Sequence, residues 1–111
     1  EQAVALGERT YSPYTAEAMT SLGALHREQG ELGQAVTALR RGLSLAAKTE
    51  IEPIKLALLR FELARCLWPE SSARGEAREL ASQALAGIDA STFATNYETV
   101  SSWLDAHPAE E

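Results

Sequence analysis

The 111-residue chain has few of the residues that build disulfides, metal sites and β-sheets. It contains one cysteine, Cys66, and two histidines. A single cysteine excludes an internal disulfide framework and is typical of a reducing compartment, so we expect a cytoplasmic protein. Valine and isoleucine together number six, whereas alanine numbers 20 and leucine 15. Because alanine and leucine favour helices and β-branched residues favour strands, this composition predicts an all-α protein.

Positive charge is also scarce, and the sequence has no long hydrophobic run. Ten lysines and arginines against 16 aspartates and glutamates give a formal net charge of −6. Nucleic acids and anionic membranes attract clustered positive charge, so we expect neither as a partner. No apolar run approaches the roughly 18 residues of a membrane-spanning helix. The acidic balance instead favours a basic or neutral protein or peptide as the partner.

The sequence lacks the short motifs that carry common catalytic chemistry. It has no Gly-rich phosphate-binding loop and none of the motifs of a protein kinase. His26 and His107 stand far from Cys66 in the sequence, and metal ligands do not cluster. Cys66 lies between Leu63 and Leu67 on an apolar helix face, which predicts a buried small hydrophobe. We therefore expect no enzyme activity, no cofactor and no metal in this chain.

Apolar residues recur at steps of three and four along most of the chain, which is the spacing of one helix face. Pro13 and Pro53 occupy positions typical of a first helical turn. Gly30 is placed to end a helix in the left-handed conformation, and Pro69 ends the helix before it. The helices that we predict are 2–8, 13–29, 32–48, 53–68, 73–88 and 92–106, followed by an acidic tail at 107–111.

The links between these helices are short, which makes consecutive helices antiparallel neighbours. No segment alternates with period two, so no sheet is predicted. In the helix at 13–29, the apolar residues Ala16, Met19, Leu22 and Leu25 mark one face of the helix. The result is a chain of helical hairpins at 13–48 and 53–88.

The two hairpins share one sequence pattern. Leu22 and Gly23 correspond to Leu63 and Ala64, 41 residues later, and the offset becomes 42 after the turn of the second hairpin. Small residues at such positions let two helices cross closely. The residues expected to form the packing of the repeats are Leu22, Gly23, His26, Gly30, Ala35, Leu39, Leu63, Ala64, Leu67, Ala77, Ala81 and Ala84.

This pattern resembles the tetratricopeptide repeat, most closely in the first hairpin. The matching residues there are Leu22, Gly23, Gly30, Leu32, Ala35, Leu39 and Leu43. His26 stands where the family usually has tyrosine, and Gly42 stands where it usually has alanine. The offset of about 42 residues, rather than 34, is similar to the long-helix repeats of kinesin light chains.

The resemblance implies antiparallel helical hairpins stacked in a right-handed superhelix, forming a single domain over 1–111. Residues 1–9 would be the tail helix of a preceding repeat, and 92–106 a C-terminal capping helix. The stretches 61–68 and 103–107 are similar to C-terminal helical-repeat regions of myxobacterial serine/threonine protein kinases and related regulators. This similarity implies a bacterial signalling protein and a chain cut from a longer repeat array.

The function expected from the resemblance is non-catalytic protein–protein binding by a scaffold or adaptor. The first helix of each hairpin would line a concave face that holds a peptide or a partner helix. The residues expected to bind there are Thr20, Arg27, Phe61, Arg65 and Trp68. Aromatic and arginine side chains together are typical interface anchors. The sequence leaves open the alternative that Phe61 and Trp68 pack against Tyr97 and Trp103 of the last helix.

Two other functions remain open from the sequence. The chain could be the regulatory C-terminal segment of a multidomain signalling enzyme such as a serine/threonine protein kinase. It could also be a structural oligomerisation module. Two full repeats are near the lower limit for a stable stack. We therefore expect either a homodimer through the exposed N-terminal half-repeat or a missing N-terminal portion.

Overall fold

The computed structural model describes residues 13–109, which form five α-helices and one short 3₁₀ helix. The helices are α2 (Pro13–Glu28), α3 (Leu32–Ala46), α4 (Pro53–Leu67), η1 (Ser71–Ala73), α5 (Arg74–Ala86) and α6 (Ala94–Ala106). No strand occurs between residues 13 and 109, so the prediction of an all-α chain is confirmed. The helix predicted at 2–8 lies outside the described residues.

Two helices begin later than predicted, because local turns take up their first residues. The 3₁₀ helix η1 occupies Ser71–Ala73, so α5 starts at Arg74. Before α6, the Asp89 carboxylate accepts bonds from the backbone N–H and the hydroxyl of Ser91, at 2.9 and 2.7 Å. These bonds lower the pKa of Asp89 below its ordinary value. The turn that they hold delays α6 until Ala94.

The C-terminus of α2 is closed by Gly30, as the sequence predicts. Gly30 has a φ of 79°, in the left-handed region that favours glycine. Its N–H donates to the Arg27 carbonyl at 3.0 Å, and the Glu31 N–H donates to the His26 carbonyl at 2.8 Å. This pair of bonds is the Schellman motif, and it satisfies carbonyl groups at the end of the helix. The chain therefore turns back within three residues, and α3 runs antiparallel to α2.

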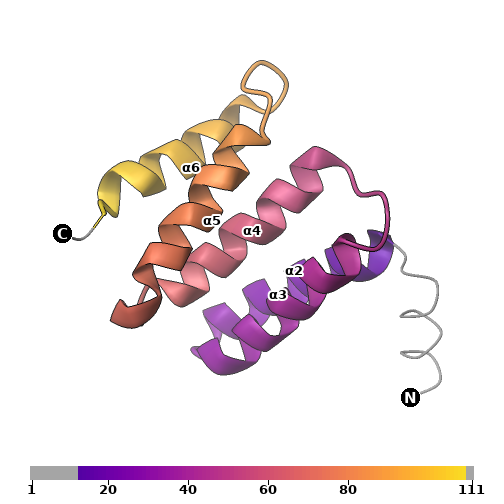
Figure 1. The fold of residues 1–111 in the computed structure, drawn as a ribbon, viewed down its shortest axis with the longest axis vertical. Coiled ribbons are helices and arrows are strands. Elements are labelled where there is room, and N and C mark those ends of the chain that lie inside the picture. The colour runs from indigo at the N-terminus through magenta and orange to yellow at the C-terminus, as the bar shows by residue number, and fades with distance from the viewer. Residues whose placement is uncertain (1–12, 110–111) are drawn as a thin grey trace.

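The helices form two hairpins and a final helix, each packed beside the next (Figure 1). Helix α2 packs on α3, and α4 packs on α5. Between the hairpins, α4 contacts both α3 and α2. Helix α6 packs on α5 at the opposite end of the molecule from α2 and α3. The hairpin boundaries at 13–48 and 53–88 thus correspond to pairs of packed helices.

The core follows the small and aliphatic residues of the sequence pattern. Four large side chains are almost fully buried: Leu39, Leu59, Leu63 and Val100. Among the predicted packing positions, the buried ones are Gly23, Ala35, Leu39, Leu63, Ala64, Leu67, Ala77, Ala81 and Ala84. Burying apolar area at about 25 cal/mol per Å² makes this shared core the main source of stability.

Leu22 is an exception, and the prediction that it forms part of the packing between repeats is wrong. The apolar residue Leu25 on the same helix is exposed as well. Leu22 is 38% exposed and Leu25 is 49% exposed. Among residues 16–28 of α2, the buried ones are Ala16 and Gly23, so this part of the helix presents a narrow edge of small residues to the core. The apolar face of this helix, which is defined by steps of three and four residues, is wider than this edge. Its outer members therefore remain on the surface of the first hairpin.

Ion pairs also connect the two hairpins. The Arg40 guanidinium of α3 donates to both carboxylate oxygens of Glu76 in α5, at 2.9 and 3.2 Å. The hydrogen bonds raise the pKa of Arg40 and lower the pKa of Glu76. Lys55 of α4 lies 3.3 Å from the Glu17 carboxylate of α2. Both pairs are exposed to solvent, which screens their attraction, so they contribute little to the stability of the fold.

Gly23 lies at a close approach of α2 and α3. A Cβ atom built at Gly23 would lie 2.4 to 2.8 Å from three side-chain carbon atoms of Leu39. Leu39 itself is fully buried. Because carbon atoms pack at about 3.5–4.0 Å, any side chain at Gly23 must displace Leu39 or separate the helices.

We expect Gly23→Ala to lower the free energy of unfolding by about 1–3 kcal/mol through overpacking. A loss of stability would be informative, because helix propensity alone predicts a gain: alanine is more favourable than glycine in a helix interior by about 1 kcal/mol. Urea denaturation followed by circular dichroism measures the change. Gly75→Ala is the matched control, since a Cβ there meets no atom within 4 Å. A Gly23→Ala protein as stable as the Gly75→Ala protein would contradict the close crossing.

Candidate functional site

Side chains from α2, α4 and α6 enclose a pocket of about 270 Å³. The residues that line it are Thr20, Leu58, Phe61, Glu62, Arg65, Asn96, Thr99 and Val100. Three of the five predicted binding residues, Thr20, Phe61 and Arg65, therefore meet in one place. Of the apolar lining residues, Leu58 is partly exposed whereas Phe61 and Val100 are buried, and the other lining side chains can form hydrogen bonds. Apolar pockets with a few polar groups are the usual form of a binding site.

Glu62 is the buried charged group of this site, at 8% exposure. The Arg27 Nε of α2 donates to Glu62 Oε2. Arg65 Nη1 lies 3.9 Å from Glu62 Oε1. A buried carboxylate needs such cationic partners, because burial without them costs several kcal/mol. Arg27, predicted to bind a partner protein, is thus engaged in an internal ion pair that joins α2 to α4.

Arg65 keeps the more accessible position of the two arginines. Its side chain is 36% exposed, against 24% for Arg27. The Arg65 guanidinium carbon lies 5.3 Å from the centre of the Phe61 ring, within the range of a cation–π contact. Two guanidinium groups share one carboxylate, so the cluster of Arg27, Glu62 and Arg65 has a net charge of +1. Arg65 can present its remaining N–H groups to a ligand at the rim of the pocket.

Phe61 and Trp68 are not exposed anchors, and the packing alternative is the one that the structure shows. Phe61 is 5% exposed and lies edge-on to Trp103, with ring centres 5.8 Å apart. Trp68 is also edge-on to Trp103, at 5.6 Å. Such edge-to-face pairs stabilise by about 0.5–1.5 kcal/mol beyond their buried area. Helix α6 covers these aromatic residues, and Trp68 does not line the pocket.

The C-terminal end of α6 is fixed by a cluster around Trp103. His107 stacks on Trp103 with ring centres 4.1 Å apart, and its Nδ1 lies 2.7 Å from the Trp103 carbonyl oxygen. Arg78 of α5 donates through Nη1 to the carbonyls of Leu104 and His107. The Arg74 guanidinium lies 4.8 Å from the centre of the Trp68 ring. These contacts hold α6 in the orientation that brings its other residues to the pocket.

Asn96 and Thr99 are pocket residues that sequence reasoning missed. The sequence assigned their helix to capping, and no binding residue was expected in it. Asn96 and Thr99 share a helix face with Val100, at steps of three and four. Val100 is fully buried, so this face of α6 turns toward the core and the two polar residues border it. The sequence did contain a signal for these pocket residues, because they are polar and stand beside an apolar position on the predicted capping helix.

We expect Trp103→Ala to destabilise the protein by about 3 kcal/mol or more, because the cluster loses its central ring. Trp103→Phe keeps an aromatic ring at the same position and should cost less than half as much. Thermal unfolding followed by circular dichroism measures both changes. Equal stability of the Trp103→Ala and wild-type proteins would contradict the anchoring role of Trp103.

The thiol of Cys66 lies in the core and is not a candidate nucleophile. Cys66 is 4% exposed. Burial, with a smaller effect from Glu62, raises its pKa to about 11. The thiolate is the reactive form of cysteine, so a raised pKa and burial both make the residue inert at neutral pH. This agrees with the place on an apolar helix face that the sequence indicates.

A thiol reagent such as Ellman's reagent should therefore react with Cys66 at least about a hundredfold more slowly in the native protein than in unfolded protein at pH 8. The reaction is followed by absorbance with and without denaturant. A free glutathione standard calibrates the reagent under both conditions. A native rate close to the unfolded rate would show that the thiol is accessible or that its pKa is not raised.

Two other features, a metal site and a membrane-spanning helix, are not found in the described part of the chain. Residues 13–109 contain no group of three or more His, Cys, Asp or Glu side chains that could hold a metal ion. In the same range, no helix is both long and apolar enough to cross a membrane. Comparison with protein families, curated proteins and solved structures finds no match to this chain. The arguments about function that follow start from the pocket and the helix packing.

Proposed function

We propose that this chain is a non-catalytic protein-binding module with a tetratricopeptide-like fold. Its binding site would be the pocket between α2, α4 and α6, with an extended peptide as the ligand. The observation that carries the proposal is that four polar side chains from three helices, Thr20, Arg65, Asn96 and Thr99, line one pocket together with Leu58 and Phe61. Such a site can hold one apolar side chain and bind the adjacent peptide backbone.

The pattern of helix packing supports the tetratricopeptide-like part of the proposal. The first helices of the two hairpins, α2 and α4, contact each other, and α4 also contacts α3 of the preceding hairpin. Helix α6 packs on α5, in the position that the first helix of a third hairpin would occupy. Its Trp103 side chain contacts Phe61 of α4. In stacked repeats each unit contacts only its neighbours in this way. The small residues at the Gly23 crossing fit the same packing.

The polar groups at the pocket suit a peptide backbone. The Asn96 side chain offers both a donor and an acceptor, as a peptide group requires. The hydroxyl groups of Thr20 and Thr99 donate to the Ala16 and Thr95 carbonyls, at 3.2 and 2.9 Å, within their own helices. Both hydroxyl oxygens therefore retain acceptor capacity for backbone N–H groups. Arg65 supplies additional donors at the rim.

Peptides selected by display on the wild-type protein test this site. We expect Asn96→Ala and Arg65→Ala each to weaken a selected peptide about tenfold, as loss of a central polar contact does. Isothermal titration calorimetry measures the dissociation constants, and circular dichroism verifies the fold of each variant.

Gln83→Ala is the control, because Gln83 lies exposed on α5 and does not line the pocket. It should bind the peptide like the wild type. The site assignment is wrong if the selected peptides bind Asn96→Ala and Arg65→Ala with wild-type affinity. Failure to select any peptide from a diverse library would contradict the proposed function itself.

A further inference from the structure

A groove of about 520 Å³ lies on the first hairpin and is formed by α2 and α3 alone. Met19, Leu22 and His26 line this α2–α3 groove from α2, and its lining from α3 includes Gln34. Leu22, at 38% exposure, and Leu25, at 49%, are the exposed large hydrophobic residues of the described part of the chain. Exposed apolar side chains that gather on one surface indicate an interaction with another molecule.

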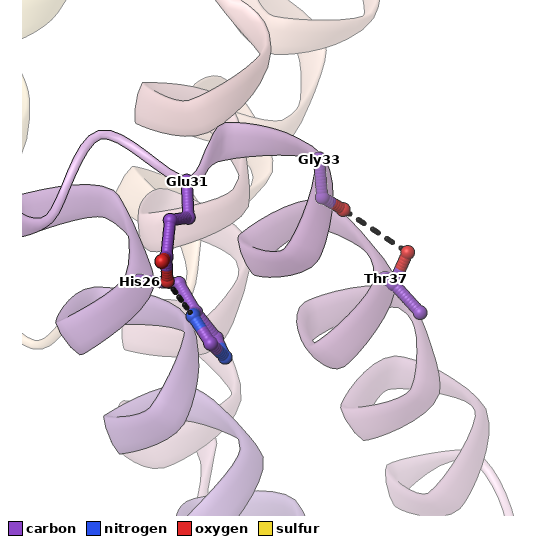
Figure 2. A network of polar contacts seen from close by, with 4 residues as sticks. All are labelled: His26, Glu31, Gly33 and Thr37. Carbon is purple, nitrogen blue, oxygen red and sulfur yellow. Dashed lines mark hydrogen bonds and ion pairs between the residues drawn. The ribbon is translucent and has the colours of Figure 1, made fainter.

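Two polar groups of the groove are already paired within the hairpin (Figure 2). His26 Nδ1 lies 2.7 Å from a carboxylate oxygen of Glu31. The Thr37 hydroxyl donates to the Gly33 carbonyl at 3.0 Å. These side chains therefore have less need of hydrogen bonds from a ligand.

The repeat pattern allows each position of the first hairpin to be compared with its counterpart in the second. Counterparts lie 41 residues later in α4 and 42 residues later in α5. Five pairs of counterparts are buried in both hairpins: Ala16 and Ala57, Gly23 and Ala64, Ala35 and Ala77, Leu39 and Ala81, and Gly42 and Ala84. The two hairpins therefore bury the same positions of the pattern.

Leu22 and Leu25 depart from this agreement. Their counterparts in α4, Leu63 and Cys66, are 0% and 4% exposed. All four residues are apolar, so the difference arises from what packs against each helix. Helix α4 has α3 of the preceding hairpin packed against it, whereas α2 is the first helix of the described range 13–109. The exposed face of α2 thus corresponds to a helix–helix interface in the second hairpin.

Helix α3 shows which apolar side chains such an interface requires. Leu32 and Val36, four residues apart on α3, pack against the core and line one pocket with Cys66 and Leu67 of α4. Leu67 is the counterpart of His26 in the α2–α3 groove. The counterpart groove is therefore covered by branched apolar residues at positions i and i+4 of a helix, which share one helix face.

The polar contacts of α3 indicate the charge of a suitable helix. The Arg40 guanidinium binds Glu76 of α5 at 2.9 and 3.2 Å, and Glu76 is the counterpart of Gln34. Between Leu32 and Ala46, α3 contains two arginines and no acidic residue. The chain has a formal net charge of −6. It therefore attracts a helix with the basic character of α3, and the Gln34 side chain can accept a hydrogen bond where Glu76 does.

Residues 1–9 are not the counterparts of the part of α3 that covers Leu63 and Cys66. A repeat of about 42 residues makes them the counterparts of 43–51. That segment packs around Leu59, in the N-terminal half of α4. The homodimer predicted through residues 1–9 involves residues outside the described range, and it leaves the face of α2 that carries Leu22 to another helix.

We propose that the α2–α3 groove binds a basic amphipathic helix of a partner protein, which covers Leu22 and Leu25 as α3 covers the corresponding face of α4. The partner helix carries branched apolar side chains at positions i and i+4 and arginine or lysine beside them. An amphipathic helix in a groove is a common mode of peptide recognition. The pocket between α2, α4 and α6 uses different residues, so binding at the groove does not require the proposed function.

A peptide with the sequence of residues 31–48 is a direct probe, because it carries the helix that covers the counterpart groove. The fluorescein-labelled peptide is titrated with the whole chain, and fluorescence anisotropy measures the dissociation constant. We expect saturable binding at about 10–100 μM, since a short peptide must order as it binds. Leu22→Gln/Leu25→Gln, which adds no charge, should weaken binding at least about tenfold.

Three controls accompany the titration. Ser82→Gln, at an exposed position of α5, should bind the peptide like the wild type. A scrambled peptide of the same composition keeps the charge but not the apolar face, so it should bind at least about tenfold more weakly. Circular dichroism verifies that Leu22→Gln/Leu25→Gln is folded, and a peptide selected for the pocket between α2, α4 and α6 should keep its affinity for this variant.

Three results would overturn the proposal. The first is a wild-type chain that shows no saturable binding of the peptide. The second is equal affinity for the wild type and Leu22→Gln/Leu25→Gln, because the peptide would then bind elsewhere or replace α3. The third is a wild-type dimer in sedimentation velocity that Leu22→Gln/Leu25→Gln abolishes, which would assign this face to a second copy of the chain.

Discussion

The packing of Trp103 between Phe61 and Trp68 is the interaction on which the candidate site depends. It joins α6 to α4 although 42 residues separate Phe61 from Trp103 in the sequence. Without it, the two aromatic residues of α4 would form an exposed surface. With it, they become part of the core, and Asn96 and Thr99 are brought beside α2 and α4. In the proposed site, polar residues therefore lie beside the buried side chain of Phe61.

The close crossing of α2 and α3 determines the other half of the molecule. Because Gly23 admits the side chain of Leu39, the two helices share a narrow line of small buried residues. The larger apolar residues of α2 consequently lie on the outer side, where Leu22 borders the α2–α3 groove. One close contact thus accounts for both the tight hairpin and its exposed apolar surface.

Much of this fold could be predicted from the sequence, because helices leave strong local signals. The spacing of apolar residues at steps of three and four located each of the five described α-helices, although not the 3₁₀ helix η1, and Gly30 located the end of α2. The burial of Ala35, Ala64 and Ala77 agrees with their repeat positions. These features depend on the conformation of a few neighbouring residues, so one sequence is sufficient to read them.

The candidate site was less predictable, because it depends on which helix covers which face. The sequence pattern placed Phe61 on the concave binding face and Leu22 on an apolar face, but it could not show that α6 covers Phe61 while Leu22 stays exposed. It also could not show that Glu62 needs Arg27 as an internal partner, since the two residues lie 35 positions apart. Pairings of this kind arise from tertiary packing and leave no local periodicity.

The most direct test of the binding face is an amide chemical-shift titration of the isotopically labelled protein with a selected peptide. The account predicts that the largest shifts fall around Thr20 of α2, Arg65 of α4, and Asn96 and Thr99 of α6. The outer faces of α3 and α5, such as Thr37 and Gln83, should change little. Shifts concentrated on α3 and α5, with the α2–α4–α6 pocket unaffected, would contradict the account.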